Sequence, residues 1–564
     1  MNGYAVPALV AVTLLTLVIG AFGVRLGRTT SDFLVASRSV SPTWNAAAIS
    51  GEYLSAASFL GVAGLVLKHG VDMLWYPVGF AAGYLALLLF VAAPLRRSGA
   101  FTLPDFCELR LGSTGLRKLA TAFVIFIGWL YLVPQLRGAG LTLRVVTHGR
   151  YELGVLVVGV VVTANVALGG MRAITFVQAF QYWLKLVALA VPVAFLLLHW
   201  QADGRPAVTP PGGPVFAHAT TVRFDQETGF TLTAPVVVQV PTGALDGASG
   251  TVPLAAGGHR VTAGARVLFP AGAEVPRVRD VDVDRGADWL LPFQPGDRGL
   301  FGTYSLILAT FLGTMGLPHV LVRFYTNPDG SAARRTTLVV LGLVGLFYLL
   351  PTLYGVLGRV YTPHLLLTGQ TDAVVLLLPG AVVGGTGGEL LGALVAAGAF
   401  AAFLSTSSGL LTSVAGVLST DLLGRGSVRD FRIAALVAGA VPLALALRVD
   451  TLDVSEAVGL AFAVAASSFC PMLVLGIWWR GLTDVGAAAG VLVGGGAAAA
   501  AVLATVLGAP SHGWAAVLLG QPAAATVPLA FLVMIGVSLA TRRRVPANVG
   551  ATMLRLHAPD ALRL

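Results

Sequence analysis

Charged residues are scarce in this sequence. Only 11% of its 564 residues are Asp, Glu, Lys or Arg, whereas 56% are hydrophobic. A soluble chain of this length needs more charge on its surface, so the composition excludes that class and predicts a polytopic membrane protein. The formal net charge of +10 does not indicate nucleic-acid binding, because the arginines cluster in short loops between apolar segments.

Cysteine and the common catalytic motifs are also scarce. The two cysteines, Cys107 and Cys470, fall in a predicted loop and a predicted span, so we expect no structural disulfide. The sequence contains no Walker A, HExxH, CxxC or G-x-S-x-G pattern. ATP-driven pumping and the common hydrolase reactions therefore lack the residues that carry them, and we predict a protein that is not an enzyme and needs no cofactor beyond a coupling ion.

Apolar runs of membrane length are abundant. Windows of about 17 to 25 residues, bounded by charges, proline and glycine, predict about thirteen spanning helices. The first window lacks a basic leader and a cleavage site, so we interpret it as a helix and not as a signal peptide. The predicted spans are 4–24, 43–67, 73–95, 118–145, 152–170, 174–200, 301–324, 335–358, 388–423, 432–448, 454–478, 483–508 and 524–541.

Basic residues gather on one side of these spans. An external N-terminus places Arg28, Arg97, Arg117 and the tail Arg542–Arg544 in the cytoplasm, and leaves few basic residues in the opposite short loops. The positive-inside rule thus predicts an external N-terminus and a cytoplasmic C-terminus. We expect a multi-pass protein of a bacterial-type plasma membrane, in contact with the lipid bilayer.

Residues 201–300 interrupt the apolar pattern. They are polar, rich in proline and glycine, and contain alternating runs such as Phe230–Thr233 and Pro235–Val240. This pattern predicts a small external β-rich insertion. The acidic run Asp280–Asp284 is compatible with a metal site, but a solvated acidic loop is the simpler interpretation.

Two spans carry polar and flexible residues near their middles. The second contains Gly51, Ser55 and Gly61, and the seventh contains the run Gly313–Pro318. Close helix packing explains the glycines alone, but matching breaks in two five-helix blocks predict an inverted repeat with a site at mid-membrane. The predicted organisation is 1–200 for the first helix and first repeat, 201–300 for the insertion, 301–478 for the second repeat, and 479–564 for two helices and a tail.

The ninth span contains four hydroxyl residues in a row, Ser405–Ser408. Ser405 and Thr406 follow Ala402 by three and four residues, so their hydroxyls and its carbonyl converge on one turn. Oxygens of this kind suit a small hard cation, and an unwound Gly51–Ser55 segment can supply the rest of the shell. The alternative is that these hydroxyls only bond back to their own helix.

Several segments together carry a family signature: Ser31–Arg38, Ser50–Gly61, Gly169–Thr175 with Gln178, Gly316–Phe324 and Ser405–Ser408. With them the chain resembles the sodium/solute symporters, and among these the cation/acetate symporters. The resemblance implies an all-α leucine-transporter-type fold with two inverted five-helix repeats and one sodium site. Its ligands would be the carbonyls of Gly51, Leu54 and Ala402 and the hydroxyls of Ser55, Ser405 and Thr406. Position 52 is Glu where acetate permeases are expected to have Asp, which leaves the role of this carboxylate open.

Substrate contacts are harder to place. Arg137 on the fourth span is a candidate counter-charge for a carboxylate, although it can also extend toward the surface near Arg144. Gln135, beside Pro134, is a second candidate, and in the implied fold Tyr53 and Thr314 would face the central cavity. We expect Lys185 to pair with a buried carboxylate or to pack structurally. Three residues near inner span ends are interpreted as topology anchors: Arg172, His319 and Arg323.

These features predict a symporter that couples inward sodium or proton movement to uptake of a short-chain monocarboxylate such as acetate, propionate or pyruvate. Another small solute such as proline is the alternative within transporters. A transporter-like membrane sensor is the alternative from a different class, but the sequence after residue 541 adds only 23 residues.

Overall fold

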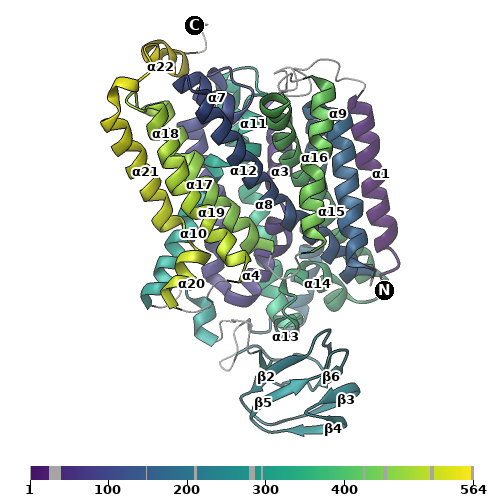
Figure 1. Ribbon diagram of the computed structural model, residues 1–564. Coiled ribbons are helices and arrows are strands. Elements are labelled where there is room, and N and C mark those ends of the chain that lie inside the picture. Colours follow the sequence, from purple (N-terminus) through teal and green to yellow (C-terminus); the bar gives the residue numbers. More distant parts are fainter. Residues whose placement is uncertain are drawn as a thin grey trace.

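The computed structural model describes residues 2–24, 40–147, 149–208, 213–278, 286–293, 296–423, 427–448, 454–508 and 513–559. The Ser31–Arg38 segment, the acidic run Asp280–Asp284 and the side chain of Arg172 lie outside the described part. The described chain forms a helical bundle with a small β-sheet at one end (Figure 1). The N-terminus lies at the end that carries the sheet, and the C-terminus lies at the opposite end.

Helices account for most of the first 200 residues. The α-helices are α1 (Ala5–Val24), α3 (Pro42–Tyr53), α4 (Val62–His69), α5 (Trp75–Ala86), α6 (Ala92–Arg97), α7 (Leu103–Leu111), α8 (Thr114–Thr147) and α9 (Tyr151–Ala202). Short π- and 3-10 turns join some of them: η2 (Ala57–Gly61), η3 (Gly70–Leu74) and η4 (Leu87–Val91).

A second group of helices follows the sheet. It begins with η5 (Gly286–Leu290), α10 (Gly296–Gly316), α11 (Pro318–Phe324), α12 (Gly330–Tyr361), α13 (Leu365–Thr368), η6 (Thr371–Ala373) and α14 (Val374–Val383). It continues with α15 (Gly385–Val417), η7 (Leu418–Leu422), α16 (Val428–Ala446) and α17 (Val454–Trp478). The last elements are α18 (Asp484–Gly490), η8 (Val491–Gly495), α19 (Gly496–Val506), α20 (Gly513–Gly520), α21 (Ala523–Ala540), η9 (Arg542–Arg544) and α22 (Val549–His557).

The predicted spans agree with these helices. Helix covers most of each predicted span, and ten continuous stretches of the described residues are long and apolar enough to cross a membrane. The sequence reasoning missed α7, α13, α14, α20 and α22, because each is shorter than a span and no membrane-length apolar window reveals it.

Both predicted interruptions are breaks in the helical backbone. α3 ends at Tyr53, Leu54 adopts φ −75° and ψ 86°, and helical structure resumes at η2. α10 ends at Gly316, Leu317 adopts ψ 116°, and Pro318 opens α11. Where a helix breaks, the last carbonyls lose their N–H partners four residues on. Each break therefore leaves main-chain oxygens inside the bundle.

Helix α9 contains two of the predicted spans. Its backbone leaves the helical conformation at Gly170, which has φ 60° and ψ −168°. A side chain is disfavoured at this positive φ, so glycine suits the position. The division between the spans 152–170 and 174–200 corresponds to this kink.

Glycines bring α3 and α15 close to α9. An added Cβ on Gly51 would lie 2.2 Å from the carbonyl oxygen of Gln178, and one on Gly398 would lie 2.4 Å from Cβ of Ala188. Small residues of this kind allow close approach between membrane helices. The packing sets the Gly51 break and the hydroxyl run of α15 against the same helix.

The insertion forms an antiparallel sheet of seven strands. The strands are β1 (Thr220–Arg223), β2 (Thr228–Leu232), β3 (Val236–Leu245), β4 (Ala248–Leu254), β5 (Gly257–Val261), β6 (Arg266–Phe269) and β7 (Arg277–Val278). Their order is β1-β6-β3-β5-β2-β7, with β4 paired to β3. Phe230 lies opposite His259 in the β2–β5 pair, and its ring packs near Phe224 and Phe269. The expected β-rich structure is confirmed, whereas its external location stays a prediction.

Candidate functional site

The break after α3 places main-chain groups in the interior. Residues Gly51–Ala56 are all buried. The N–H of Ala56 donates to Oε1 of Gln135 on α8 at 2.8 Å. A buried N–H without a helical partner needs another acceptor, and the Gln135 amide supplies it. Gln135 therefore holds the break against α8.

The hydroxyl run of α15 lies against this break. The Ser405 hydroxyl lies 2.7 Å from the carbonyl oxygen of Gly51 and 3.0 Å from that of Ala402. The Thr406 hydroxyl donates to the carbonyl of Glu52 at 2.5 Å. The structure thus brings together the two segments that the sequence pairs, α3 and α15.

Lys185 of α9 extends into the same shell. Its side chain is fully buried, and Nζ donates to the carbonyls of Gly51 and Leu54, the latter at 2.8 Å, and to the Ser405 hydroxyl at 2.7 Å. These partners are neutral oxygens and not a carboxylate, which is one of the two expectations for Lys185 beside structural packing. An ammonium has three N–H donors, and all three are used here. In this conformation the shell does not fit a sodium ion beside the ammonium. Ser55 lies buried at the same break.

A buried ion pair adjoins this shell. Nε of Arg323 on α11 donates to Oε2 of Glu52 at 2.5 Å, and both side chains are buried. Further guanidinium nitrogens donate to Thr175 Oγ1, at 2.8 Å, and to Gln178 Oε1. The Gln178 amide donates in turn to the carbonyl of Ser405 at 2.7 Å. The carboxylate at position 52 is therefore held by Arg323.

The interpretation of Arg323 and His319 as surface anchors is wrong. Their exposed fractions are 0% and 1%, because α11 turns into the bundle at the Leu317 break. The His319 ring lies 5.3 Å from the ring of Tyr131 on α8. Sequence position near a predicted span end did not reveal this burial.

Tyr53 and Thr314 meet across the two breaks. Their hydroxyl oxygens are 2.8 Å apart. The Tyr53 ring packs edge-on against Tyr84, at 4.7 Å between centroids, and near Phe80 and Phe462 at 6.0 and 6.2 Å. The two residues that the resemblance assigns to the central cavity thus share one aromatic cluster.

Two buried donors near this cluster are not used within the described residues. Nε2 of Gln135 and the hydroxyl of Tyr84 have no hydrogen-bond partner there, and both side chains are 0% exposed. A buried donor without a partner costs free energy, so such groups point to a bound molecule. The sequence analysis singled out Gln135 but missed Tyr84, which looks like any aromatic residue of a span.

Arg137 lies away from this cluster. It lines a cavity of about 400 Å³ together with Arg144, Tyr151, Phe224 and Gln226. Phe224 and Gln226 belong to the insertion, so the cavity lies between the helical bundle and the residues of the sheet region. The structure does not bring Arg137 together with Tyr53 and Thr314, and its role as counter-charge stays a prediction.

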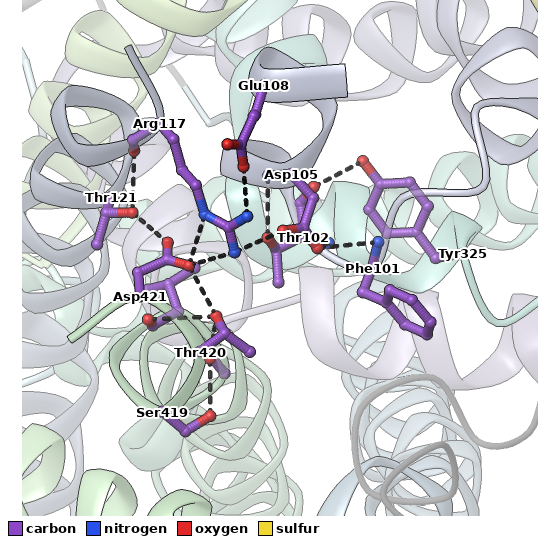
Figure 2. A network of polar contacts seen from close by, with 12 residues as sticks. Phe101, Thr102, Asp105, Glu108, Arg117, Thr121, Tyr325, Ser419, Thr420 and Asp421 are labelled. Carbon is purple, nitrogen blue, oxygen red and sulfur yellow. Dashed lines mark hydrogen bonds and ion pairs between the residues drawn. The ribbon is translucent and has the colours of Figure 1, made fainter. Parts of the chain in front are cut away.

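A second charged cluster lies at the sheet-distal end of the bundle (Figure 2). The guanidinium of Arg117 pairs with Asp105 at 2.7 Å and with Glu108 and Asp421 at 2.6 Å. Thr102 and Asp105 form a capping box at the start of α7. Arg117 therefore ties α7, α8 and η7 together at this end.

The fold is shared with solved structures of two membrane transporters. It is similar to a solved structure of a Na⁺-coupled sialic acid symporter, with a TM-score of 0.61 and 14% identity, covering 95% of this chain and 98% of that one. It is also similar to Mhp1, a nucleobase-cation-symport-1 family transporter, with a TM-score of 0.52 and 13% identity over 93% and 98% of the two chains. Both neighbours have the leucine-transporter-type fold, so the expected fold class is confirmed.

The sequence comparisons name the family. The model of the sodium:solute symporter family matches residues 33–204 and 294–494, and the chain belongs to this family. An uncharacterized symporter, YwcA of Bacillus subtilis, is 29% identical over 88% of this chain and 85% of its own length. A monocarboxylic acid transporter of Corynebacterium glutamicum is 30% identical over 90% and 86%. The protein is thus a multi-pass membrane transporter and not an enzyme, and the family implies symport of a small solute.

Proposed function

We propose that the protein couples the inward movement of a cation, sodium or proton, to uptake of a short-chain monocarboxylate such as acetate, propionate or pyruvate. Membership of the sodium:solute symporter family supports the general activity. The relative named as a monocarboxylic acid transporter supports the substrate class. We place the protein in the plasma membrane, with the N-terminus outside.

The amide of Gln135 carries the proposal. Its Oε1 accepts a hydrogen bond from the N–H of Ala56, which fixes the orientation of the amide. Its Nε2 is a donor without a partner among the described residues. The hydroxyl of Tyr84, whose ring packs against Tyr53, is a second buried donor without a partner among the described residues. A carboxylate is an acceptor-only group, and it satisfies such donors without a compensating proton. The rings of Tyr53, Phe80 and Phe462 give apolar walls for a short alkyl chain.

The aromatic cluster also constrains how a solute would bind. The rings of Tyr53 and Tyr84 are in direct contact, with centroids 4.7 Å apart. We propose that a carboxylate enters the space between these rings, and the contact between them leaves no room for it in the described conformation. We therefore assign the described conformation to a step of the transport cycle without bound solute. Before the rings of Tyr53 and Tyr84 separate, the arginines of the Arg137 cavity would attract anions by their charge.

Uptake of radiolabelled acetate by proteoliposomes tests the proposal. Inward gradients of sodium or protons are applied separately, with propionate, pyruvate and proline as competitors. We expect acetate uptake that propionate and pyruvate inhibit and proline does not. Inhibition by proline alone would indicate a different solute, and a protein that binds acetate without moving it would indicate a sensor.

A variant pair tests the assigned donor. Gln135→Leu removes the amide at similar volume, and we expect acetate affinity to fall by about ten-fold, equivalent to about 1.4 kcal/mol. Thr142→Val is the matched control, because Thr142 also has a buried hydroxyl without a partner among the described residues and lies on the same helix. Equal affinities in the two variants would contradict the role of Gln135.

A further inference from the structure

Lys185 occupies the shell that the sequence assigns to sodium. Its ammonium contacts Gly51, Leu54 and Ser405, three of the six predicted sodium ligands. The Ser405 hydroxyl lies 3.0 Å from the carbonyl of Ala402, a fourth member of that set. The shell therefore already contains a positive charge, which cannot diffuse away because it is the side chain of a residue of α9.

The described side chains around the shell carry excess positive charge before any ion is added, because Lys185 and Arg323 face the single carboxylate of Glu52. Glu52 is the nearby carboxylate, and it is paired with Arg323 at 2.5 Å. The other groups that Lys185 contacts are neutral oxygens. A sodium ion added to this shell would meet a buried ammonium of the same sign with no free carboxylate among its described contacts to offset it. Uncompensated charge of this kind is costly in a buried site.

We propose that Lys185 is the resident cation of this shell: its ammonium takes the position of the coupling sodium, so that uptake does not require sodium. The inference rests on the proposed function, because it specifies which cation the symporter uses. Within that function it leaves the proton as the driving cation. Sodium-independent uptake would differ from the sodium coupling that the name of the sodium:solute symporter family implies.

Direct sodium binding tests the inference independently of the solute. Purified full-length protein is incubated with ²²Na⁺, and bound label is measured for the wild type and for Lys185→Ala, which vacates the shell. We expect no saturable binding to the wild type and saturable, close to stoichiometric binding to the variant. Equal binding by both proteins, whether absent or stoichiometric, would overturn the inference.

Controls keep the result interpretable. Lys118→Ala removes a lysine that is exposed on α8 and should match the wild type. If Lys185→Ala does not fold, Lys185→Gln replaces it, because glutamine removes the charge but keeps a hydrogen-bond donor for the carbonyls. Both variants are checked for a single species by size-exclusion chromatography before the label is added.

Uptake measurements give the second arm. We expect acetate uptake in sodium-free choline buffer with an inward proton gradient to equal that in sodium buffer with the same gradient. An uptake that occurs only with sodium and saturates with it would overturn the inference while confirming the proposed function. Absence of acetate, propionate and pyruvate uptake under every gradient would refute the proposed function, and the ²²Na⁺ comparison would still decide the role of Lys185.

Discussion

Arg323 and Glu52 join the two broken helices through one buried ion pair. Arg323 lies on α11, after the Leu317 break, and Glu52 lies on α3, two residues before the Leu54 break. Nε and Oε2 are 2.5 Å apart, and neither side chain reaches the surface. The pair therefore connects the two interrupted helices, α3 and α10–α11, beside the candidate site.

Removal of one member of this pair should destabilise the protein strongly. Glu52→Gln leaves the buried guanidinium of Arg323 without its counter-charge, and we expect a loss of about 3 to 5 kcal/mol in the free energy of unfolding. The double variant Glu52→Gln/Arg323→Met removes both charges and should recover much of that loss. Thermal unfolding in detergent measures both, and a double variant no more stable than the single one would contradict this account.

The hydroxyls of Ser405 and Thr406 should matter for transport. They bond to carbonyls of α3, whereas the Ser408 hydroxyl bonds to Leu404 of its own helix. We expect the double alanine variant to lose about 0.5 to 1.5 kcal/mol per hydrogen bond and to take up acetate slowly. Ser408→Ala is the matched control and should transport normally. Equal uptake in both variants would show that the α3–α15 contacts are dispensable.

Arg137 should act on an anion that approaches through water. It lines the cavity beside Arg144, so its charge raises the local concentration of anionic solute. We expect Arg137→Gln to raise KM for acetate several-fold at low salt, by about three- to ten-fold, with a smaller effect at high ionic strength because exposed charges are screened. Arg205→Gln, an exposed residue outside the cavity lining, is the control. An effect that salt does not change would instead indicate direct contact with bound solute.

The Arg117 cluster should make stability depend on pH once its cation is removed. Burial raises the pKa of Asp105 above its usual value, and Arg117 counteracts that rise. Arg117→Met leaves Asp105, Glu108 and Asp421 together without their shared cation. A carboxyl with a raised folded-state pKa favours folding when it is protonated, so the variant should lose stability as pH rises through that pKa. Melting temperatures at pH 5 and pH 8 measure the effect.

The sign of that difference is the decisive outcome. We expect the variant to lie further below the wild type at pH 8 than at pH 5. Arg544→Met is the matched control, because it breaks a more exposed pair with Asp484 at 3.0 Å and should change little at either pH. A variant deficit that grows toward pH 5 would contradict the proposed coupling of the three carboxylates.

The insertion should be accessible to protease from outside the cell. Its strands contain arginines with exposed side chains, among them Arg223 and Arg260. Trypsin added to right-side-out vesicles should cut within residues 213–278 and leave the helical bundle intact. Cleavage only in inverted vesicles would reverse the predicted orientation.

The sequence revealed the helical fold more readily than the site. Membrane-length apolar runs predicted the spans, and Gly51 and Pro318 marked the two breaks, because both residues affect the backbone locally. Short helices such as α14 lack any local signal of membrane length. The position of Lys185 depends on how α9 is rotated against α3, which a single sequence does not specify. A spacing signal existed: Gln178, Gln181 and Lys185 recur on one face of an otherwise apolar helix.

The kink at Gly170 makes the second half of α9 a lever. Thr175 lies five residues beyond the kink and Lys185 fifteen, or about 7.5 and 22 Å along the axis. A pivot at Gly170 therefore moves the ammonium about three times as far as it moves Thr175. A swing large enough to withdraw Lys185 from Gly51 and Leu54 displaces the hydrogen bond between Thr175 and Arg323 far less. In such a swing Lys185 would leave the α3 break before Thr175 leaves Arg323, and the Arg323–Glu52 pair, which has no member on α9, would stay in place.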